Sequence, residues 1–225
     1  MQTTVKHLAI IMDGNRRWAK REGQSAYKGH QAGVLALDKV IGGCRKRGIK
    51  YLTVYGFSTE NWGRTQSEVK QLIAVLEAAI KKYTDLLNKE NWQLRVIGRP
   101  KDFPKSTQSL LAKSMNQLRD NQSGVLTLAL SYGGRDEILR AVAKAKLSSS
   151  KLTEKDFSEL LDTKGMPDPD LIIRTGGQTR LSNFLLWQSS YSELYFVPTL
   201  WPDFSNRHLD QALTEYTKRK RNFGK

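Results

Sequence analysis

Short apolar segments rich in β-branched residues alternate along the chain with longer segments of helical period. Six of the apolar segments are candidate strands, at residues 7–12, 51–57, 93–98, 125–132, 171–174 and 194–197. Several of them are almost continuously apolar, which is typical of strands covered on both faces. The alternation predicts an α/β fold with a mostly parallel central sheet of about six strands, flanked by helices.

The clearest helical pattern covers residues 67–87. Its apolar residues recur at intervals of three and four, at Val69, Leu72, Ile73, Leu76, Ile80, Tyr83 and Leu87. Ser67 is the expected N-cap of this helix. Other helices are expected at residues 33–47, 106–119, 135–147, 154–162 and 208–221. Residues 148–151 are expected to form a surface loop, and Thr153 with Asp156 resembles a capping box for the helix that follows.

The length of 225 residues suits a single domain, which we expect to cover residues 1–225. Cys44 is the only cysteine, which excludes an internal disulfide and a cysteine-based zinc site. No apolar run approaches the roughly 20 residues that span a bilayer, and the N-terminus lacks a signal-peptide pattern. We therefore expect a cytoplasmic protein.

The chain is strongly basic. It carries 37 Lys and Arg against 22 Asp and Glu, which gives a net charge of +15. Three classes of partner fit such a charge: nucleic acid, an anionic membrane surface, and phosphorylated small molecules. Net charge alone does not choose among them, and a basic surface without a partner is also compatible with it.

The segments that follow four of the predicted strands are rich in glycine, arginine and small polar residues: residues 13–18, 58–64, 133–135 and 174–182. Ligands of open parallel sheets bind beyond the carboxyl ends of the strands. Glycine lets backbone N–H groups approach phosphate oxygens, and arginine supplies paired, permanently charged donors. One such turn is more often a plain loop, but four together predict a diphosphate site. Asp13, the single carboxylate beside the arginines of the first segment, is the expected ligand of a Mg²⁺ ion shared with the substrate.

Several common phosphate-binding motifs are missing from the sequence. It contains no G-x-x-x-x-G-K-[ST] and no G-x-G-x-x-G after the first strand, which argues against a P-loop ATPase and a dinucleotide-binding enzyme. It also contains no Asp-Asp pair, which argues against a trans-type prenyl synthase.

Three blocks of the sequence resemble the cis-prenyltransferases, the undecaprenyl diphosphate synthase family. Residues 7–19, with MDGNRRW at their centre, resemble the first signature, and residues 57–62 resemble the second. Residues 170–177 and 180–188 resemble the third, which residues 192–196 and 201–204 extend. The resemblance covers nearly the whole chain. It implies an enzyme that condenses isopentenyl diphosphate with an allylic diphosphate, with farnesyl diphosphate as the expected primer. The product would be a longer polyprenyl diphosphate such as undecaprenyl diphosphate.

The resemblance also implies roles for individual residues. Asp13 matches the essential carboxylate that binds Mg²⁺, and Asn61 matches a further catalytic residue. Glu193 matches a second metal-associated carboxylate, which in this family can be contributed across a homodimer contact. Asn15 is a candidate for orienting the coupling step. The implied substrate-binding residues are Gly14, Asn15, Arg16, Arg17, Trp18, His30, Ser58, Glu60, Trp62, Arg64, Arg174, Arg180 and Ser182.

The growing prenyl chain would need an apolar slot. The helix at residues 67–87 is expected to line it together with Leu126, Leu128 and Leu130. Packing in the hydrophobic core explains the same apolar residues, so the pattern is compatible with either a product-binding slot or a plain core.

Four positions depart from the family pattern. Ala26 stands where an arginine is typical, Gln178 where a glutamate is typical, Ser131 where an asparagine is typical, and Asn222 where an arginine is typical. Losing a diphosphate-binding arginine weakens binding by about 1.5–3 kcal/mol, and Lys28, Arg16, Arg219 or Arg221 are candidates to compensate. These departures do not change the expected reaction class. They leave the product length open, and a short-chain or terpenoid-forming relative of the family is an alternative.

Two further readings compete with an elongating enzyme. A non-catalytic partner subunit would be expected to lack the aspartate of the first signature, whereas Asp13 is present. A nucleic-acid-binding protein would interleave basic residues with exposed aromatic ones, whereas many arginines here lie at glycine turns, so we expect no nucleic-acid partner. The basic charge and an apolar product favour a peripheral membrane contact, and the resemblance favours a homodimer.

Overall fold

A six-stranded sheet forms the centre of the molecule, and every pair of neighbouring strands in it is parallel. The structure is a computed structural model and describes residues 3–145 and 152–219. The strands lie in the order β3-β4-β2-β1-β5-β6. Their bounds are β1 His7–Ile11, β2 Tyr51–Ser58, β3 Trp92–Gly98, β4 Gly124–Tyr132, β5 Leu171–Arg174 and β6 Glu193–Phe196. All six predicted strands are present, which confirms the predicted α/β class.

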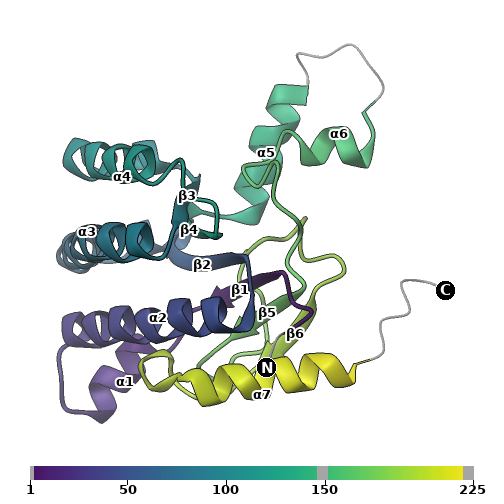
Figure 1. The fold of residues 1–225 in the computed structure, drawn as a ribbon. Helices are drawn as coiled ribbons and strands as arrows, with labels where there is room; N and C mark the ends of the chain where they lie inside the picture. Colours follow the sequence, from purple (N-terminus) through teal and green to yellow (C-terminus); the bar gives the residue numbers. More distant parts are fainter. Residues whose placement is uncertain (1–2, 146–151, 220–225) are drawn as a thin grey trace.

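Seven α-helices occur in the described residues, and most of them cover one face of the sheet. Helices α2, α3 and α4 lie side by side on that face, and α7 lies along α2 (Figure 1). Helices α5 and α6 lie together at a distance from this layer (Figure 1). The bounds are α1 Asn15–Arg21, α2 Ala26–Arg47, α3 Gln66–Lys89, α4 Lys105–Gln117, α5 Gly134–Ala145, α6 Glu154–Ser158 and α7 Asn206–Lys218. Three short 3₁₀ helices are η1 Thr59–Gly63, η2 Pro100–Asp102 and η3 Trp201–Asp203.

The sheet separates two hydrophobic cores because successive residues of a strand point to opposite faces. In β1, Leu8 and Ile10 belong to the larger core, which α2, α3, α4 and α7 cover. Ala9 and Ile11 belong to the smaller core on the other face, where Phe184 and Leu185 pack against them. Both faces of the central strands are therefore buried, as their continuous apolar character predicted.

Several predicted helix boundaries were wrong. The segment after β1, expected as a loop, is the first turn of α1. Helix α2 begins at Ala26, not at residue 33, and Ser25 caps it by accepting from the backbone N–H of Lys28. Thr65, not Ser67, caps α3. Helix α6 ends at Ser158, four residues before its predicted end at residue 162.

Other helix predictions agree with the structure or lie outside it. The capping box of Thr153 and Asp156 is confirmed. The predicted surface loop at residues 148–151 lies outside the described residues, as do residues 146 and 147 of one predicted helix and 220 and 221 of another. Across residues 3–145 and 152–219, no helix combines the length and apolar character needed to cross a membrane.

Candidate active site

The carboxylate of Asp13 lies just beyond the end of β1, between two guanidinium groups. Nη2 of Arg17 is 3.1 Å from Oδ1 of Asp13, and Nη2 of Arg174 is 3.1 Å from Oδ2. Arg174 is the last residue of β5, which pairs directly with β1. Parallel pairing of adjacent strands thus brings together two residues that lie 161 positions apart in the sequence.

Arg174 also organises the loop that contains two other predicted site residues. Its side chain is 6% exposed. Nη1 donates to Oγ of Ser182 over 2.6 Å and also to the backbone carbonyl of Arg180. Its buried Nε has no hydrogen-bond partner among the described residues. Arg174 therefore connects Asp13 to the loop that contains Arg180 and Ser182.

The chain turns from β1 into α1 at Gly14. Gly14 has a φ of 115°, and a Cβ atom there would lie 3.0 Å from Leu200. Both the left-handed conformation and the close approach require glycine. The turn places Asn15, Arg16 and Arg17 in the first turn of α1, directly after the Asp13 carboxylate.

A cavity of ≈ 340 Å³ lies above this turn, and we call it the basic cavity. It is lined by Met12, Asp13, Gly14, Asn15, Arg16, Arg17, His30 and Arg64. Three of these residues are arginines, and Asp13 is the only acid among them, so the cavity has an excess of positive charge. Guanidinium groups around such a space suit the paired oxygens of a diphosphate.

His30 reaches the basic cavity from α2 as a neutral imidazole. Burial first, and then the positive charges of Arg64 and Arg16, together lower the pKa of His30 from 6.5 to about 4. Near neutral pH the ring therefore offers one N–H donor and one acceptor nitrogen, without adding to the positive charge of the cavity.

The segment from Ser58 to Arg64 follows β2 and forms η1. Oδ1 of Asn61 accepts from the backbone N–H of Ser58 over 3.0 Å, so this side chain closes its own turn. Oε1 of Glu60 accepts from Nδ2 of Asn183 over 3.2 Å. Of the predicted residues of this segment, Arg64 lines the basic cavity, whereas Ser58, Glu60, Asn61 and Trp62 do not.

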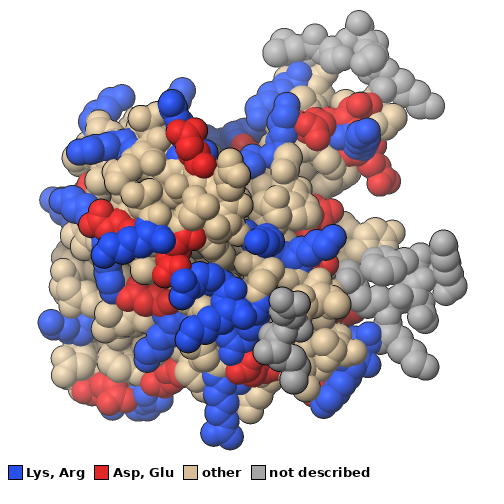
Figure 2. Space-filling view, viewed as in Figure 1, with Lys and Arg blue, Asp and Glu red and all other residues tan. Residues whose placement is uncertain are grey.

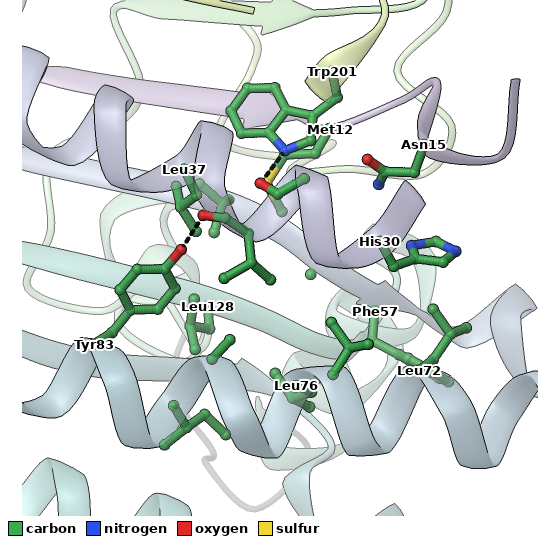
Figure 3. A pocket seen from close by; sticks show the side chains of 17 residues that line it. Met12, Asn15, His30, Leu37, Phe57, Leu72, Leu76, Tyr83, Leu128 and Trp201 are labelled. Carbon is green, nitrogen blue, oxygen red and sulfur yellow. Dashed lines mark hydrogen bonds between the residues drawn. The ribbon is translucent and has the colours of Figure 1, made fainter. Parts of the chain in front are cut away.

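An apolar pocket of ≈ 100 Å³ adjoins the basic cavity and shares Met12, Asn15 and His30 with it. Figure 3 shows Asn15 and His30 at one end of this pocket and Tyr83 at the other. There the Tyr83 hydroxyl donates to the backbone carbonyl of Val34 over 2.5 Å, which links α3 to α2. The other lining residues are Gly33, Leu37, Val54, Gly56, Phe57, Leu72, Val75, Leu76, Ala79, Ile80, Leu128 and Trp201.

The prediction for this pocket was correct only in part. Helix α3 lines it, as expected, and so does Leu128. Leu126 and Leu130 are fully buried in the core instead. Helix α2 contributes Val34 and Leu37, which the sequence analysis did not assign to the pocket.

Two predicted residues lie away from Asp13. Trp18 donates from Nε1 to Asp203 over 2.8 Å on the η3 side of α1 and does not line the basic cavity. Glu193 begins β6 and pairs in register with Leu171, which pairs with Leu8 near the start of β1. This places Glu193 roughly 15 Å back along the strand direction from Asp13. Its carboxylate accepts from Arg219 over 2.6 Å.

The positions that depart from the family pattern have identifiable surroundings. Ala26 lies in a small cavity that His30 and Arg64 also line. Of the residues considered as compensation, Arg16 lines the basic cavity, whereas Lys28 lies on an outer groove with Trp18 and Leu35. Arg219 pairs with Glu193, and Arg221 and Asn222 lie outside the described residues.

Gln178 accepts from Arg180 through Oε1 over 2.6 Å. The amide is neutral, so it holds the Arg180 guanidinium without cancelling its charge. A glutamate at this position would form an ion pair with Arg180 and lower the positive charge available to a phosphate group.

The Asp13 carboxylate suits a metal ion that is bound partly by a substrate. Across residues 3–145 and 152–219, no group of three or more His, Cys, Asp or Glu side chains is placed to hold an ion by itself. Mg²⁺ commonly takes one or two protein carboxylates and completes its shell with substrate oxygens and water. Asp13 lines the basic cavity and fits such a shared ion.

The structure adds two residues that the sequence analysis did not assign to the site. Oγ1 of Thr175 donates to the backbone carbonyl of Asp13 over 2.7 Å and fixes the main chain under the carboxylate. Asn183, at φ 66°, accepts from the backbone N–H groups of Gly134 and Arg135. Both residues lie inside segments that resemble a family signature. Their position in these segments was the only sequence signal that could have indicated a role in the site.

Comparison with known proteins agrees with the family resemblance found in the sequence. A family model described as "Putative undecaprenyl diphosphate synthase" matches residues 11–224. Isoprenyl transferase of Clostridium perfringens is 45% identical over 226 residues, which cover 97% of this chain and 89% of that protein. Isoprenyl transferase of Aquifex aeolicus is 44% identical over 221 residues, covering 98% and 96%.

Two solved structures resemble the whole chain. Lavandulyl diphosphate synthase from Lavandula x intermedia, in complex with dimethylallyl diphosphate, has a TM-score of 0.94 at 35% identity and covers 99% of both chains. A probable undecaprenyl diphosphate synthase from Campylobacter jejuni has a TM-score of 0.85 at 33% identity and covers 100% of both chains.

Proposed function

Because the chain belongs to the undecaprenyl diphosphate synthase family of prenyltransferases, we propose that it condenses isopentenyl diphosphate with an allylic diphosphate. Farnesyl diphosphate is the proposed primer, and the product is a longer polyprenyl diphosphate. One observation carries the proposal: the basic cavity around Asp13 opens beside an apolar pocket and shares three residues with it. A diphosphate joined to a hydrocarbon tail needs both environments at this spacing.

The arginines of the site have a direct role in the proposed reaction. Negative charge develops on the diphosphate as it leaves the allylic carbon. Arg16, Arg17 and Arg64 line the basic cavity and would stabilise that charge by fixed guanidinium donors. Arg174, Arg180 and Ser182 would bind the diphosphate of isopentenyl diphosphate, next to Asp13.

Asp13 would hold Mg²⁺ together with substrate oxygens. The ion would supply electrostatic stabilisation of the departing diphosphate. The amide of Asn15, whose Oδ1 is buried without a partner among the described residues, is the candidate for orienting the coupling carbons. We also propose a catalytic role for Asn61, because it lies in η1, three residues before Arg64, which lines the basic cavity.

A short-chain product is the second candidate function. Tyr83 and its hydrogen bond to Val34 close the apolar pocket at a volume of ≈ 100 Å³. The similarity to lavandulyl diphosphate synthase, whose structure holds the five-carbon dimethylallyl diphosphate, favours the same reading. The two candidates share the reaction and differ in how many isopentenyl units are added.

We also propose a homodimer and a peripheral contact with anionic membranes. Leu139 and Val142 of α5 are 68% and 39% exposed, which suits burial against a second copy of the chain. In a dimer, the partner's copy of Glu193 is the carboxylate that the family resemblance brings toward Asp13. Figure 2 shows a dense group of Lys and Arg near the C-terminal end of α2, where Arg45, Lys46 and Arg47 form the last turn.

Product analysis tests the proposal. Purified protein is incubated with Mg²⁺, isopentenyl diphosphate and primers of 5, 10 or 15 carbons, and products are identified by mass spectrometry. Release of diphosphate with a lengthened prenyl chain is the expected result, and the set of product lengths separates the two candidates. Absence of any coupled product with all three primers would contradict the proposed reaction. Co-sedimentation with anionic vesicles at low salt tests the membrane contact.

A further inference from the structure

Ser131 occupies an unusual position at the end of β4. It is fully buried and has a φ of 45°, a conformation that residues with a side chain rarely adopt. Such backbone outliers concentrate at functional sites, where surrounding contacts hold them in place. The contacts of the Ser131 side chain therefore need an explanation beyond strand packing.

The Ser131 hydroxyl joins two elements that are distant in sequence. It accepts from Nε1 of Trp62, in η1, over 2.8 Å. It donates to Oδ2 of Asp102, in η2, over 2.6 Å. A hydroxyl has one hydrogen to donate, so the carboxylate of Asp102 fixes that hydrogen and leaves a lone pair directed at the indole. The three groups form a hydrogen-bonded chain in which each bond favours the next.

The Asp102 end of this chain has a fixed position. The residue before η2, Arg99, donates from its backbone N–H to the carbonyl of Leu130 over 3.0 Å, next to Ser131. The backbone N–H of Asp102 in turn donates to the carbonyl of Arg99 over 3.0 Å. Helix η2 is therefore attached to the end of β4 independently of the Asp102 side chain.

The Trp62 end belongs to the segment that borders both parts of the active site. The indole ring packs against Phe57, with ring centroids 4.8 Å apart, and against Phe103, at 5.2 Å. Phe57 lines the apolar pocket. Two residues after Trp62, Arg64 lines the basic cavity. The contacts of Trp62 therefore constrain the backbone of η1 next to Arg64.

We propose that Ser131 and Asp102 are positioning residues that hold Trp62 and, through it, the diphosphate-binding side of η1. This inference deepens the proposed function and rests on it, because the ligand of the basic cavity is taken to be a diphosphate. Without the Ser131 hydroxyl, the indole N–H loses its partner and η1 loses its anchor to β4. The consequence is weaker diphosphate binding, with the coupling step itself less affected.

The test compares S131A, D102A, W62F and the double variant S131A/W62F. Binding of inorganic pyrophosphate is measured by calorimetry, and kcat and KM are measured for the allylic diphosphate. Each single variant should weaken pyrophosphate binding and raise KM by about fivefold to tenfold, the scale of one lost hydrogen bond. For S131A and D102A the change in kcat should stay within about threefold. The double variant should be no worse than either single variant, since both remove the same interaction.

Two controls make the test decisive. D102N keeps an oxygen that accepts from Ser131 and should recover affinity to within about twofold of wild type. S114A removes a buried hydroxyl that bonds Thr84 in another part of the core, so it should lower stability without changing pyrophosphate affinity. Because Asp102 is exposed, D102A removes the anchor without opening the core.

The outcomes distinguish this inference from the proposed function. S131A and D102A with wild-type pyrophosphate affinity and KM, although the Trp62 indole N–H resonance has shifted, would overturn the positioning role. Additive losses in the double variant would overturn it as well. A wild-type protein that binds pyrophosphate without making product would instead contradict the proposed reaction, while the pyrophosphate affinities of the variants would still decide the positioning role.

Discussion

Arg174 donates to Asp13 across the junction of two adjacent strands, from Nη2 to Oδ2 over 3.1 Å. The same guanidinium holds Ser182 and the carbonyl of Arg180 through Nη1. One buried side chain therefore fixes the carboxylate that we assign to the metal and the loop that we assign to isopentenyl diphosphate. The consequences of this arrangement can be measured.

Replacing Arg174 by lysine should lower kcat/KM for isopentenyl diphosphate by at least about tenfold, because a single ammonium cannot hold three partners in a fixed plane. R174K keeps the positive charge, so a loss separates geometry from net charge. Steady-state kinetics with isopentenyl diphosphate varied gives the comparison. R174K with wild-type kcat/KM would show that charge alone is sufficient.

Shortening Tyr83 should lengthen the product. Y83A removes the side chain that closes the apolar pocket, and the distribution of chain lengths seen by mass spectrometry should shift upward by at least one isopentenyl unit. Leu87→Ala is the matched control, because Leu87 is fully buried on the same helix and does not line the pocket. Both variants should lose roughly 2–5 kcal/mol of stability. Equal product lengths in Y83A and wild type would remove Tyr83 as the end of the pocket.

Removing divalent metal should stop catalysis without loosening the fold. The Asp13 carboxylate is already paired with Arg17 and Arg174, so the folded protein does not need the ion for charge balance. EDTA should therefore abolish turnover, Mg²⁺ should restore it, and the midpoint of thermal unfolding should stay unchanged. Turnover that persists in EDTA would contradict the metal role of Asp13.

Acid should destabilise the protein partly through His7. Burial lowers the pKa of His7 to about 4, against an ordinary value of 6.5. Above pH 6.5 both folded and unfolded chains carry the neutral ring, so His7 adds no pH dependence there. Between pH 6.5 and about 4 the unfolded chain takes up a proton that the folded chain excludes, so the free energy of unfolding falls.

The His7 contribution between pH 7 and pH 4.5 should be about 2–3 kcal/mol. H7Q cannot titrate but keeps a donor and an acceptor for Pro167 and Thr53, the partners of the ring. Denaturant unfolding of both proteins at the two pH values measures the difference. An identical fall in H7Q and wild type would show that His7 does not carry this dependence.

The sequence predicted the sheet better than the helix starts, for a physical reason. Continuous apolar segments have few alternatives to buried parallel strands, and parallel pairing then forces their carboxyl ends to one edge. The start of a helix is less constrained: the first turns of α2, which the prediction missed, contain Gly29, and glycine weakens the helical pattern of a sequence. In the structure, a Cβ atom on Gly29 would lie 2.2 Å from the carbonyl oxygen of Asn15. Gly29 therefore permits close packing of α1 on α2.

The sequence pointed to site residues that directly follow strand ends. It did not show which residues reach the site, or turn away from it, through the packing of helices and loops. Helical period assigned Tyr83 to an apolar face, but the same period describes a core residue and a pocket residue. Trp18 lies in the first signature, yet its indole turns toward Asp203 because α1 presents that face to η3. The Asp102 contact of Ser131 joins two loops whose proximity no local pattern encodes.

The central claim is that Asp13 acts at the diphosphate, and one comparison tests it most directly. Diphosphate release is measured for wild type, D13A and the control D85A, an exposed aspartate on α3, with Mg²⁺, isopentenyl diphosphate and farnesyl diphosphate. Circular dichroism confirms that all three are folded. The account predicts that D13A loses at least about 10³-fold in kcat/KM, while D85A retains wild-type turnover. A folded D13A protein that releases diphosphate at the wild-type rate would contradict it.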